Sequence, residues 1–533
     1  MMFLFNKKFC TNLGRFSFIG KCINKAMLAN LLFCCSPLLV FLLIICLLDV
    51  NPFRWVPLMN DEVGWHMDVH SLVEYGAPPG FTGYDENHAA VGRFGPWGAF
   101  LVWGMALFGK VFGWCWCSQL FMNVFYLMLA NFVFLLFTKP SWQAALRLAV
   151  LNFISFLSIY YMFTGMSECT RFSLSIVLAG LFYFLLKDEN RRKRSYFIVL
   201  GIVAPIVLFL FVNCYILFAI LLPVYGYVWY RYLNPVRFRS LSFVFLCIIL
   251  PAFCALVCVF IQVKTSAPYP ISTLRIYLSQ PNLAAFGGVF KDIVVANFKS
   301  ADISFILNNA KLINGCASSY LLFYYLLAAV SFVQLVVTFK NSKTVCLLNL
   351  LVVYVLLTFV LAFVTLYSTT APWTYIRGLN VALVFSLYLV CMFDWRKWQL
   401  VLLGLMFMQL FPCTTQLREE MCMRYSFCNC YGGGYELFEK YAPVFSAKLV
   451  PSKSKDPWDN TIAFYGQTYN FNCAIPAGFS WNYILDGHIV SKPRYIITDK
   501  SLTCAFAGYE KTYSDDLMNI FEKVAQSKPT GKE

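Results

Sequence analysis

Uncharged apolar runs of about 20 residues recur along the chain, and an α-helix of this length can cross the hydrocarbon core of a bilayer. The first run covers residues 27–49, MLANLLFCCSPLLVFLLIICLLD. The 533 residues are 60% hydrophobic and only 13% charged, whereas about 25% of residues are charged in ordinary soluble domains. These features exclude a water-soluble globular protein and predict an all-α polytopic membrane protein.

About eleven segments are predicted to span the membrane. They cover residues 27–49, 118–138, 142–163, 170–186, 196–212, 213–230, 241–262, 318–339, 344–366, 378–394 and 398–412. The loops rich in lysine and arginine should face the cytoplasm. They are the N-terminal segment and residues 187–194, 231–239, 340–343 and 395–397. This bias accounts for the net charge of +16, so no nucleic-acid partner is predicted.

The apolar segment 97–113 is predicted not to span the membrane. Counting it as a span would move the basic run 187–194 to the outer side, against the positive-inside rule. It also contains Lys110 and four glycines. We expect a helix that lies in the membrane interface, within a first outer loop of residues 50–117.

The segment after residue 412 is predicted to fold outside the membrane. Residues 1–412 would form the transmembrane domain, and residues 413–533 are long enough for a small extracytoplasmic α+β domain. The stretch PRYIITD predicts a strand, and DDLMNIFEKVAQ predicts a helix at the C-terminal end. Disulfides would suit an oxidising outer side, but the cysteine spacing leaves their pairing open and matches no standard zinc signature.

The loop after the first span concentrates acidic, histidine and aromatic side chains. It opens with MNDEVGWH, which places the adjacent carboxylates of Asp61 and Glu62 near a membrane surface, where ionised groups are costly unless water or a partner receives them. His66 and His70 lie one helical turn apart, a spacing that suits a metal pair, but no third ligand follows at a fixed spacing. An ordinary solvated loop is the simpler alternative.

Four short motifs resemble those of the GT-C type membrane glycosyltransferases, which use polyprenyl-phosphate sugars. This family includes protein O-mannosyltransferases, dolichyl-phosphate-mannose-type mannosyltransferases and aminoarabinose transferases. Its outer loop opens with an acidic pair, as in Asn60-Asp61-Glu62, and its interfacial helix follows a turn like Gly95-Pro96-Trp97-Gly98. A second acid precedes a later span, as in Gly165-Met166-Ser167-Glu168, and an arginine opens a late span, as in Tyr375-Ile376-Arg377-Gly378.

The resemblance implies a GT-C fold and an inverting glycosyltransferase in the plasma (inner) membrane. The expected donor is a polyprenyl-phosphate sugar, and the expected acceptor is a cell-surface glycan, lipid or protein on the outer face. Membrane lipids would surround the spans, with the N-terminus cytoplasmic and the C-terminal domain extracytoplasmic. The resemblance does not identify the sugar or the linkage.

Glycosyl transfer from a lipid phosphate requires a base for the acceptor hydroxyl and a cation for the leaving phosphate. We predict Asp61 as the general base, with Glu62 orienting the acceptor or supporting Asp61. Glu168 is the second acidic candidate, although a structural ion pair with Arg171, three residues later, would explain it equally well.

Arginines are the predicted phosphate ligands because guanidinium binds phosphate bidentately. Arg377 and Arg275 are the main candidates, and His66, His88 and Arg93 are predicted to reach the same groove. For each arginine, a side chain that only extends to the membrane surface is the alternative. A divalent metal is the other cation that would serve, and the sequence does not decide between them.

Two other functions stay open at this stage. A flippase or transporter for a lipid-linked glycan would have a similar composition, but such folds often show internal repeats and broken helices near the bilayer midplane. This chain shows no repeat, few ionisable groups lie deep within the predicted spans, and the charges cluster at one face. A polysaccharide polymerase would differ from the predicted transferase mainly in its acceptor.

Overall fold

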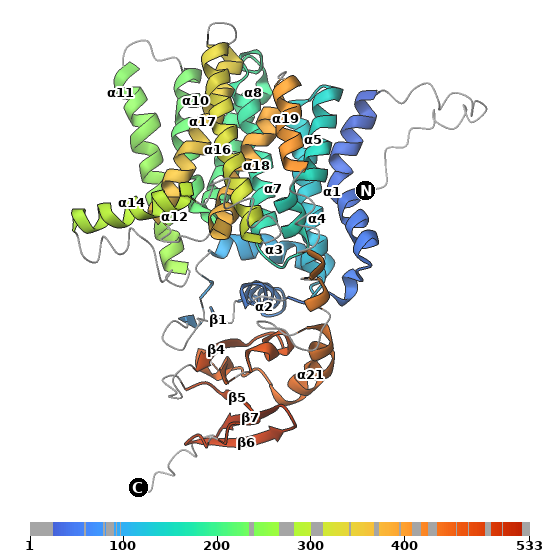
Figure 1. The fold of residues 1–533 in the computed structure, drawn as a ribbon. Coiled ribbons are helices and arrows are strands. Elements are labelled where there is room, and N and C mark those ends of the chain that lie inside the picture. Colours follow the sequence, from blue (N-terminus) through green and yellow to red (C-terminus); the bar gives the residue numbers. More distant parts are fainter. Residues whose placement is uncertain are drawn as a thin grey trace, which may run out of the picture.

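The computed structural model describes most of the chain. The described residues are 25–57, 60–77, 80–81, 90–91, 93–95, 98–233, 239–265, 282–299, 313–339, 343–366, 372–393, 396–407, 417–419, 421–424, 434–454, 456–466, 468–484, 492–503 and 505–524. They form a bundle of long helices and a small C-terminal sheet, with one helix, α2 (Asn60–Tyr75), between the two parts (Figure 1).

The bundle consists of helices that match the predicted spans closely. Their bounds are α1 Lys25–Leu48, α4 Ser118–Thr138, α5 Trp142–Ile154, α6 Phe156–Met162, α7 Glu168–Leu186, α8 Arg194–Ile198, α9 Ala204–Cys214, α10 Leu221–Leu233, α11 Arg239–Val244, α12 Leu250–Thr265, α16 Ile313–Thr338, α17 Lys343–Leu366, α18 Pro372–Cys391 and α19 Arg396–Phe407. When α8 and α9 are counted as one continuous helix (Arg194–Cys214), α11 and α12 likewise (Ser240–Thr265), and α10 together with the turn before it (Ile216–Leu233), eight described helices are long and apolar enough to cross a membrane. This confirms the mainly helical, multi-pass architecture.

One predicted span differs from a single straight helix. The segment predicted as 142–163 is broken into α5 and α6, which are bent by 60° at Ser155. α18 has 20 residues, and α19 has 12, with residues 408–412 of the predicted last span outside the described part of the chain. Ser155 joins α5 to α6 and donates or accepts a hydrogen bond with Ser158 at 3.0 Å, so polar side chains occupy the break.

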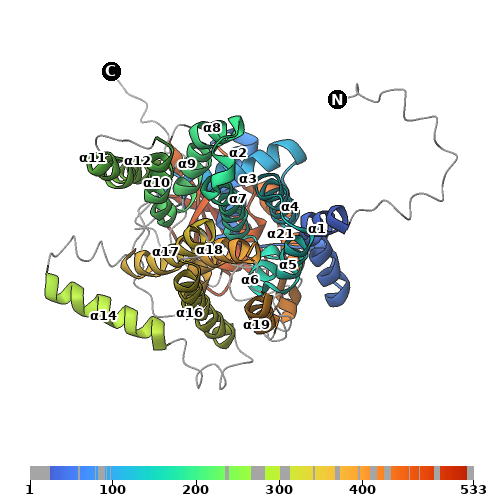
Figure 2. The ribbon, with the colours of Figure 1, turned by 90° about the horizontal axis from the view of Figure 1, so that it is seen from above.

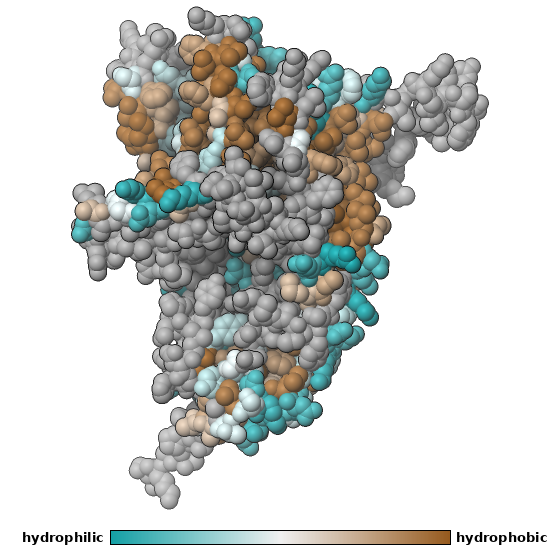
Figure 3. Space-filling model, viewed as in Figure 1, coloured by the Kyte–Doolittle hydropathy of each residue, from teal (hydrophilic) through white to brown (hydrophobic). Residues whose placement is uncertain are grey.

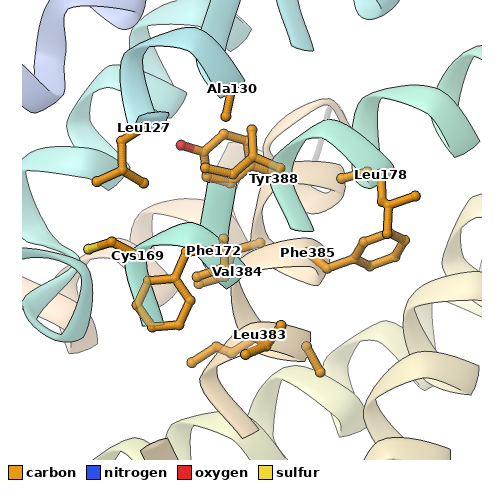
Figure 4. Packing of buried hydrophobic residues seen from close by; sticks show 14 of the residues in the cluster. Leu127, Ala130, Cys169, Phe172, Leu178, Leu383, Val384, Phe385 and Tyr388 are labelled. Atoms are coloured by element: carbon orange, nitrogen blue, oxygen red, sulfur yellow. The ribbon is translucent and has the colours of Figure 1, made fainter. Parts of the chain in front are cut away.

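The centre of the bundle is a core of α4, α7 and α18. α7 is deeply enclosed, because 89% of the residues in its most apolar stretch are buried. Figure 2 shows α7 between α4, α9 and α18. Figure 4 shows Leu127, Phe172 and Phe385 from these three helices meeting in one cluster. Within it, the Tyr388 hydroxyl bonds to the side-chain oxygens of Asn131 (2.9 Å) and Asn152 (2.8 Å). Burial of apolar surface and these satisfied polar groups together position the ends of α7 and α18.

Two further helices stand apart from the vertical bundle. α3 (Ala99–Phe112) lies beside α2 at the base of the bundle, and its 14 residues are too few to cross a bilayer. α14 (Leu283–Lys299) extends sideways from the bundle (Figures 1 and 2). The short α3 agrees with the prediction that 97–113 is not a span, and its interfacial position stays a prediction.

The C-terminal region contains a five-stranded mixed sheet in the order β4-β3-β5-β7-β6. Its strands are β3 Thr461–Tyr465, β4 Ser480–Ile484, β5 Tyr495–Asp499, β6 Tyr509–Ser514 and β7 Met518–Lys523. β3 pairs in parallel with β4 and β5, whereas β7 pairs antiparallel with β5 and β6. Helix α21 (Tyr435–Lys448) packs on one face, which confirms a small α+β unit.

The prediction of a helix in DDLMNIFEKVAQ is wrong, because this segment contains strand β7. Its apolar residues Leu517, Ile520, Phe521 and Val524 follow the helical spacing i, i+3, i+4, i+7, so the sequence pattern alone favours a helix. In the fold, Met518 and Ile520 pack with α21 while Phe521 packs on the opposite face of the sheet. Pairing with β5 and β6 therefore decides the conformation, as tertiary contacts commonly do for short segments.

The surface of the molecule differs between the helical bundle and the C-terminal region. Large apolar side chains are exposed along the outer helices, including Leu28 and Leu42 on α1 and Phe253 and Phe260 on α12. Figure 3 shows brown apolar atoms over the bundle and more teal polar atoms around the C-terminal region. Exposed apolar side chains on helices of this length are expected to contact lipid chains.

Candidate active site

Asp61 lies in the first turn of α2, at the junction between the helical bundle and the C-terminal sheet. Acidic residues are favourable in this turn because they face the positive end of the helix dipole. The Asp61 side chain is 31% exposed, so an incoming molecule can reach it. Its neighbour Glu62 points in another direction and is fully buried.

Arg377 connects Asp61 with Glu168. Its Nε donates a hydrogen bond to Glu168 Oε1 at 2.6 Å, and its Nη2 lies 3.9 Å from Asp61 Oδ2. Glu168 begins α7 and Arg377 lies in the first turns of α18, so the ends of two central helices meet the start of α2. The Arg377 side chain is 26% exposed, whereas that of Glu168 is 1% exposed. The structure thus brings together three predicted site residues.

Arg171 extends this cluster behind Glu168. Its Nη1 lies 3.9 Å from Glu168 Oε1, which is the i,i+3 pairing considered from the sequence, but Arg377 is much closer. The Arg171 guanidinium also lies over the Tyr215 ring, 4.6 Å from its centroid. Glu168 is therefore a buried carboxylate held between two arginines, and such pairing offsets the cost of burying its charge.

Glu62 forms a separate buried ion pair with Arg424. Both side chains are completely enclosed, and the two guanidinium nitrogens of Arg424 donate to the two carboxylate oxygens at 2.8 and 2.9 Å. Arg424 also donates to the Val56 carbonyl and lies over the Trp55 ring, 4.9 Å from its centroid. This bidentate geometry is the strong and orientation-specific form of an arginine–carboxylate pair.

Gly165 completes the surroundings of Glu62. Its backbone N–H donates to Glu62 Oε1 at 2.9 Å, three residues before Glu168. A Cβ at this position would lie 2.8 Å from Gln119 Oε1, 3.0 Å from the Trp55 ring and 3.1 Å from Glu62 Cβ. A larger residue at this position would require Gln119, Trp55 or Glu62 to shift, so glycine best suits this close approach.

The surroundings of Asp61 favour a carboxylate that can accept a proton. Burial raises the pKa of Asp61 above the ordinary value of an aspartate, and the Arg377 guanidinium opposes this rise. The neighbouring charges of Glu168 and Glu62 raise it further. A raised pKa makes an ionised carboxylate a stronger base, provided that the working pH stays above it.

The histidine predicted to bind substrate is enclosed by aromatic rings. His66 is 1% exposed and stacks on Trp116 and Trp114, with ring centroids at 3.8 and 5.6 Å. Burial lowers its pKa well below the usual value, and the nearby His70 adds to this. Contacts between the His66 ring and the Asp61 cluster are absent among the described residues, so we leave His66 out of the proposed site.

Of the other predicted binding residues, Arg93, His88 and Arg275, the structure describes only Arg93. Arg93 is exposed, in a short segment whose neighbour Phe94 donates a backbone hydrogen bond to the Thr265 carbonyl at the end of α12. His88 and Arg275 lie outside the described residues. A cluster of three or more histidine, cysteine or acidic side chains suited to a metal ion does not occur in the described part of the chain.

An apolar groove of about 430 Å³ runs along α9, α10 and α12. Its lining includes Val212, Trp229 and Cys258, and almost all of its surface is apolar. Tyr215, which stacks against Arg171, follows Val212 by three residues. The groove therefore reaches to within three residues of Tyr215, which contacts Arg171 of the charged cluster.

Arg424 is the residue that the sequence reasoning missed. It lies in MCMRYSF, far in the sequence from Glu62, and the nearby acidic residues Glu419 and Glu420 give no indication of this distant partner. The sequence offers one indication of a missing cation, which is that Asp61 and Glu62 are adjacent carboxylates near a membrane. A buried carboxylate there needs a partner, so a cation is expected for whichever of the two is not accessible. The second carboxylate therefore requires a cation from elsewhere in the chain.

Comparisons with known proteins were made for the sequence and the structure. No family model matches the sequence, and a search of curated proteins found no match. Among solved structures, the chain is similar to the AglB oligosaccharyltransferase of Archaeoglobus fulgidus in complex with an inhibitory peptide and a dolichol-phosphate (TM-score 0.43, 12% identity, covering 89% of this chain and 69% of that chain). It is also similar to an Archaeoglobus fulgidus oligosaccharyltransferase tethered to an acceptor peptide (TM-score 0.42, 12% identity, 89% and 68%). A third similar structure is ArnT from Cupriavidus metallidurans bound to undecaprenyl phosphate (TM-score 0.41, 11% identity, 92% and 98%).

Proposed function

We propose that the chain is an integral membrane glycosyltransferase that uses a polyprenyl-phosphate sugar as donor. The observation that carries this proposal is the accessible Asp61 carboxylate, which shares Arg377 with the buried Glu168 where α7 and α18 begin. A base and a fixed cation side by side are the two groups that glycosyl transfer from a lipid phosphate requires.

In the proposed reaction, Asp61 accepts the proton of the acceptor hydroxyl as its oxygen attacks C1 of the sugar. The bond between C1 and the phosphate oxygen breaks, and its electron pair stays with the phosphate. Attack from the face opposite to the phosphate inverts the configuration at C1. The products are the glycosylated acceptor, the polyprenyl phosphate and a protonated Asp61, which then releases its proton to water.

Arg377 is proposed to hold the donor phosphate. Glu168 binds its Nε, which fixes the plane of the guanidinium and keeps Nη2 beyond hydrogen-bond distance of Asp61, at 3.9 Å. A phosphate oxygen that enters between these groups would receive a charge-assisted hydrogen bond. Glu168 is thus assigned a positioning role rather than that of the base.

The apolar groove along α9, α10 and α12 is proposed to receive the donor's lipid tail. Its lining is apolar and its end approaches Tyr215 and the charged cluster, so the tail can stay in the bilayer while the phosphate reaches Arg377. We propose a glycan, lipid or protein acceptor on the outer face of the plasma membrane.

The proposed topology follows from the two ends of the bundle. The basic segment before α8 lies at one end of the bundle, and α2 and the C-terminal sheet lie at the other (Figure 1). Under the positive-inside rule the first end is cytoplasmic, so the C-terminal domain proposed for residues 413–533 would be extracytoplasmic.

The topology is tested with single reporter cysteines in a cysteine-free chain. An impermeant thiol reagent added to intact cells should label a cysteine at position 459, in the C-terminal region, and should not label one at the exposed position 192. After the cells are broken, both positions should react. Labelling of position 192 in intact cells would contradict this topology.

The function is tested by incubating the purified protein in vesicles with labelled polyprenyl-phosphate sugar and an extract of acceptor glycans and lipids. A transferase releases polyprenyl phosphate and labels the acceptor, whereas a flippase moves the intact donor across the bilayer. We expect Asp61→Asn to reduce release by about a hundredfold or more, because the variant keeps the side chain's size but removes the base. Donor binding and thermal unfolding should stay close to those of the wild type.

The proposed role of Asp61 also predicts how the transfer rate in this assay depends on pH. Because burial raises the pKa of Asp61, the wild-type rate should fall on the acidic side at a higher pH than an ordinary aspartate would give. Near-normal turnover of Asp61→Asn would exclude Asp61 as the base. Movement of the intact donor without release of polyprenyl phosphate would contradict the transferase proposal.

The phosphate ligand is tested with Arg377→Lys. Lysine keeps the charge but lacks the planar fork that binds Glu168 and the phosphate together. We expect roughly a ten- to hundredfold loss in turnover with a weaker affinity for the donor, as for a lost hydrogen bond to a charged group. Steady-state kinetics with the labelled donor would measure both.

Arg147→Lys is the matched control. Arg147 also makes several hydrogen bonds, to the Cys391 and Phe393 carbonyls at the far end of α18, and should leave donor kinetics unchanged when replaced. If Arg377→Lys behaves like the wild type while Arg275→Lys fails, Arg275 binds the phosphate instead.

A further inference from the structure

Two tryptophans and two cysteines alternate in the loop that joins α3 to α4. The sequence is Trp114-Cys115-Trp116-Cys117, and α4 begins at Ser118. Cys115 is exposed and Cys117 is partly exposed, so small molecules in solution can reach both thiols. The proposed transfer reaction does not use this loop.

The two thiols face each other. Their sulfur atoms are 3.4 Å apart, and Cys115 Sγ also lies 3.3 Å from the Ser118 hydroxyl. A disulfide has a sulfur–sulfur distance of about 2.05 Å, so the two sulfur atoms must approach by little more than about 1 Å to form one. The bond would close a small ring around Trp116.

We propose that Cys115 and Cys117 form a reversible redox site that closes to a disulfide by exchange with an external disulfide of the glutathione or thioredoxin type. In the first step, the Cys115 thiolate attacks one sulfur of the external disulfide and displaces one thiolate. In the second step, Cys117 loses its proton and attacks the Cys115 sulfur, which displaces the other thiolate. Two protein thiols are oxidised, and one external disulfide is reduced to two thiols.

The local chemistry assigns different roles to the two cysteines. The hydrogen bond from the Cys117 thiol, together with those from the Ser118 side chain, lowers the pKa of Cys115 to about 5. The same contact raises the pKa of Cys117. Cys117 is the N-cap of α4, so the positive end of the helix dipole favours a thiolate in the pair. Cys115 is the more exposed of the two thiols, so we assign it as the attacking thiol and Cys117 as the one that completes the disulfide.

The loop contacts both neighbouring parts of the molecule. The Trp116 ring stacks on His66 of α2 at 3.8 Å and meets Phe438 of α21 edge-on at 5.4 Å. The Trp114 indole donates a hydrogen bond to the His66 carbonyl at 3.2 Å. Closing the ring would restrict Trp116 and thus tighten the contact between the helix that carries Asp61 and the C-terminal region.

The proposal is tested on the purified full-length protein. After reduction, the protein is equilibrated with mixtures of reduced and oxidised glutathione, quenched with N-ethylmaleimide and mapped by peptide mass spectrometry. We expect the two cysteines of this peptide to become protected from N-ethylmaleimide without carrying a glutathione adduct. Reduction with dithiothreitol should restore their labelling. Cys115 should also react with maleimide at pH 6 roughly tenfold faster than the exposed Cys422.

Two variants separate the roles of the thiols, and a third is the control. Cys117→Ser should stop as a stable glutathione adduct on Cys115, whereas Cys115→Ser should react slowly. Cys422→Ser should behave like the wild type at positions 115 and 117. The proposal would be overturned if both thiols of the wild-type protein react with maleimide at every glutathione ratio. It would also be overturned if Cys115 forms only a glutathione adduct and no disulfide with Cys117.

Discussion

Glu62 and Arg424 form a completely enclosed ion pair, and the arrangement of the candidate site depends on it. Each charge would be costly to bury alone, so the two side chains stabilise the fold only together. The pair holds three segments that are distant in the sequence: the start of α2, the turn at Gly165, and the segment that contains Arg424. Asp61 adjoins Glu62, and Glu168 follows Gly165 by three residues. The pair therefore sets the distance between the two acidic groups that share Arg377.

This arrangement gives the C-terminal region a direct part in the site. Arg424 precedes the sheet, and the core of the sheet includes Val63 and Met67 from α2. The Ser71 hydroxyl accepts a hydrogen bond from the Gly478 backbone at 3.1 Å, which is a further contact with the same helix. α2 is thus packed between the bundle and the sheet along much of its length. We infer that the C-terminal region fixes the orientation of Asp61, the proposed general base, rather than acting as a separate module.

Much of the architecture was predictable, because the length of an apolar run is a physical requirement of the bilayer that can be counted in the sequence. The predicted span 118–138 has the same bounds as α4, and the demotion of 97–113 agrees with a 14-residue α3. The break between α5 and α6 was not predictable, since a serine inside an apolar run is common and its consequence depends on packing. The helix expected at the C-terminal end was wrong because pairing of β7 with β5 and β6 overrides a helical apolar spacing.

The candidate site was also predictable from the sequence only in part. Asp61, Glu168 and Arg377 were predicted as individual residues, and the structure places them in one cluster. Their mutual arrangement was not predictable, because Arg377 was expected to face only a phosphate and instead binds Glu168. Glu62 was predicted to act beside Asp61, but its partner Arg424 is 362 residues away in the chain. Adjacent residues of a helix point about 100° apart, which explains how neighbouring carboxylates come to serve different purposes.

The dependence of the site on the buried pair is tested most directly by a double-mutant cycle in which the free energy of unfolding is measured in detergent micelles. Glu62→Gln and Arg424→Met should each lower it by about 3–5 kcal/mol, because each leaves one buried charge without its partner. The double variant removes both charges and should be more stable than either single variant. A double variant that loses the sum of the two single losses, within about 0.5 kcal/mol, would show that the two residues act independently and would contradict this account.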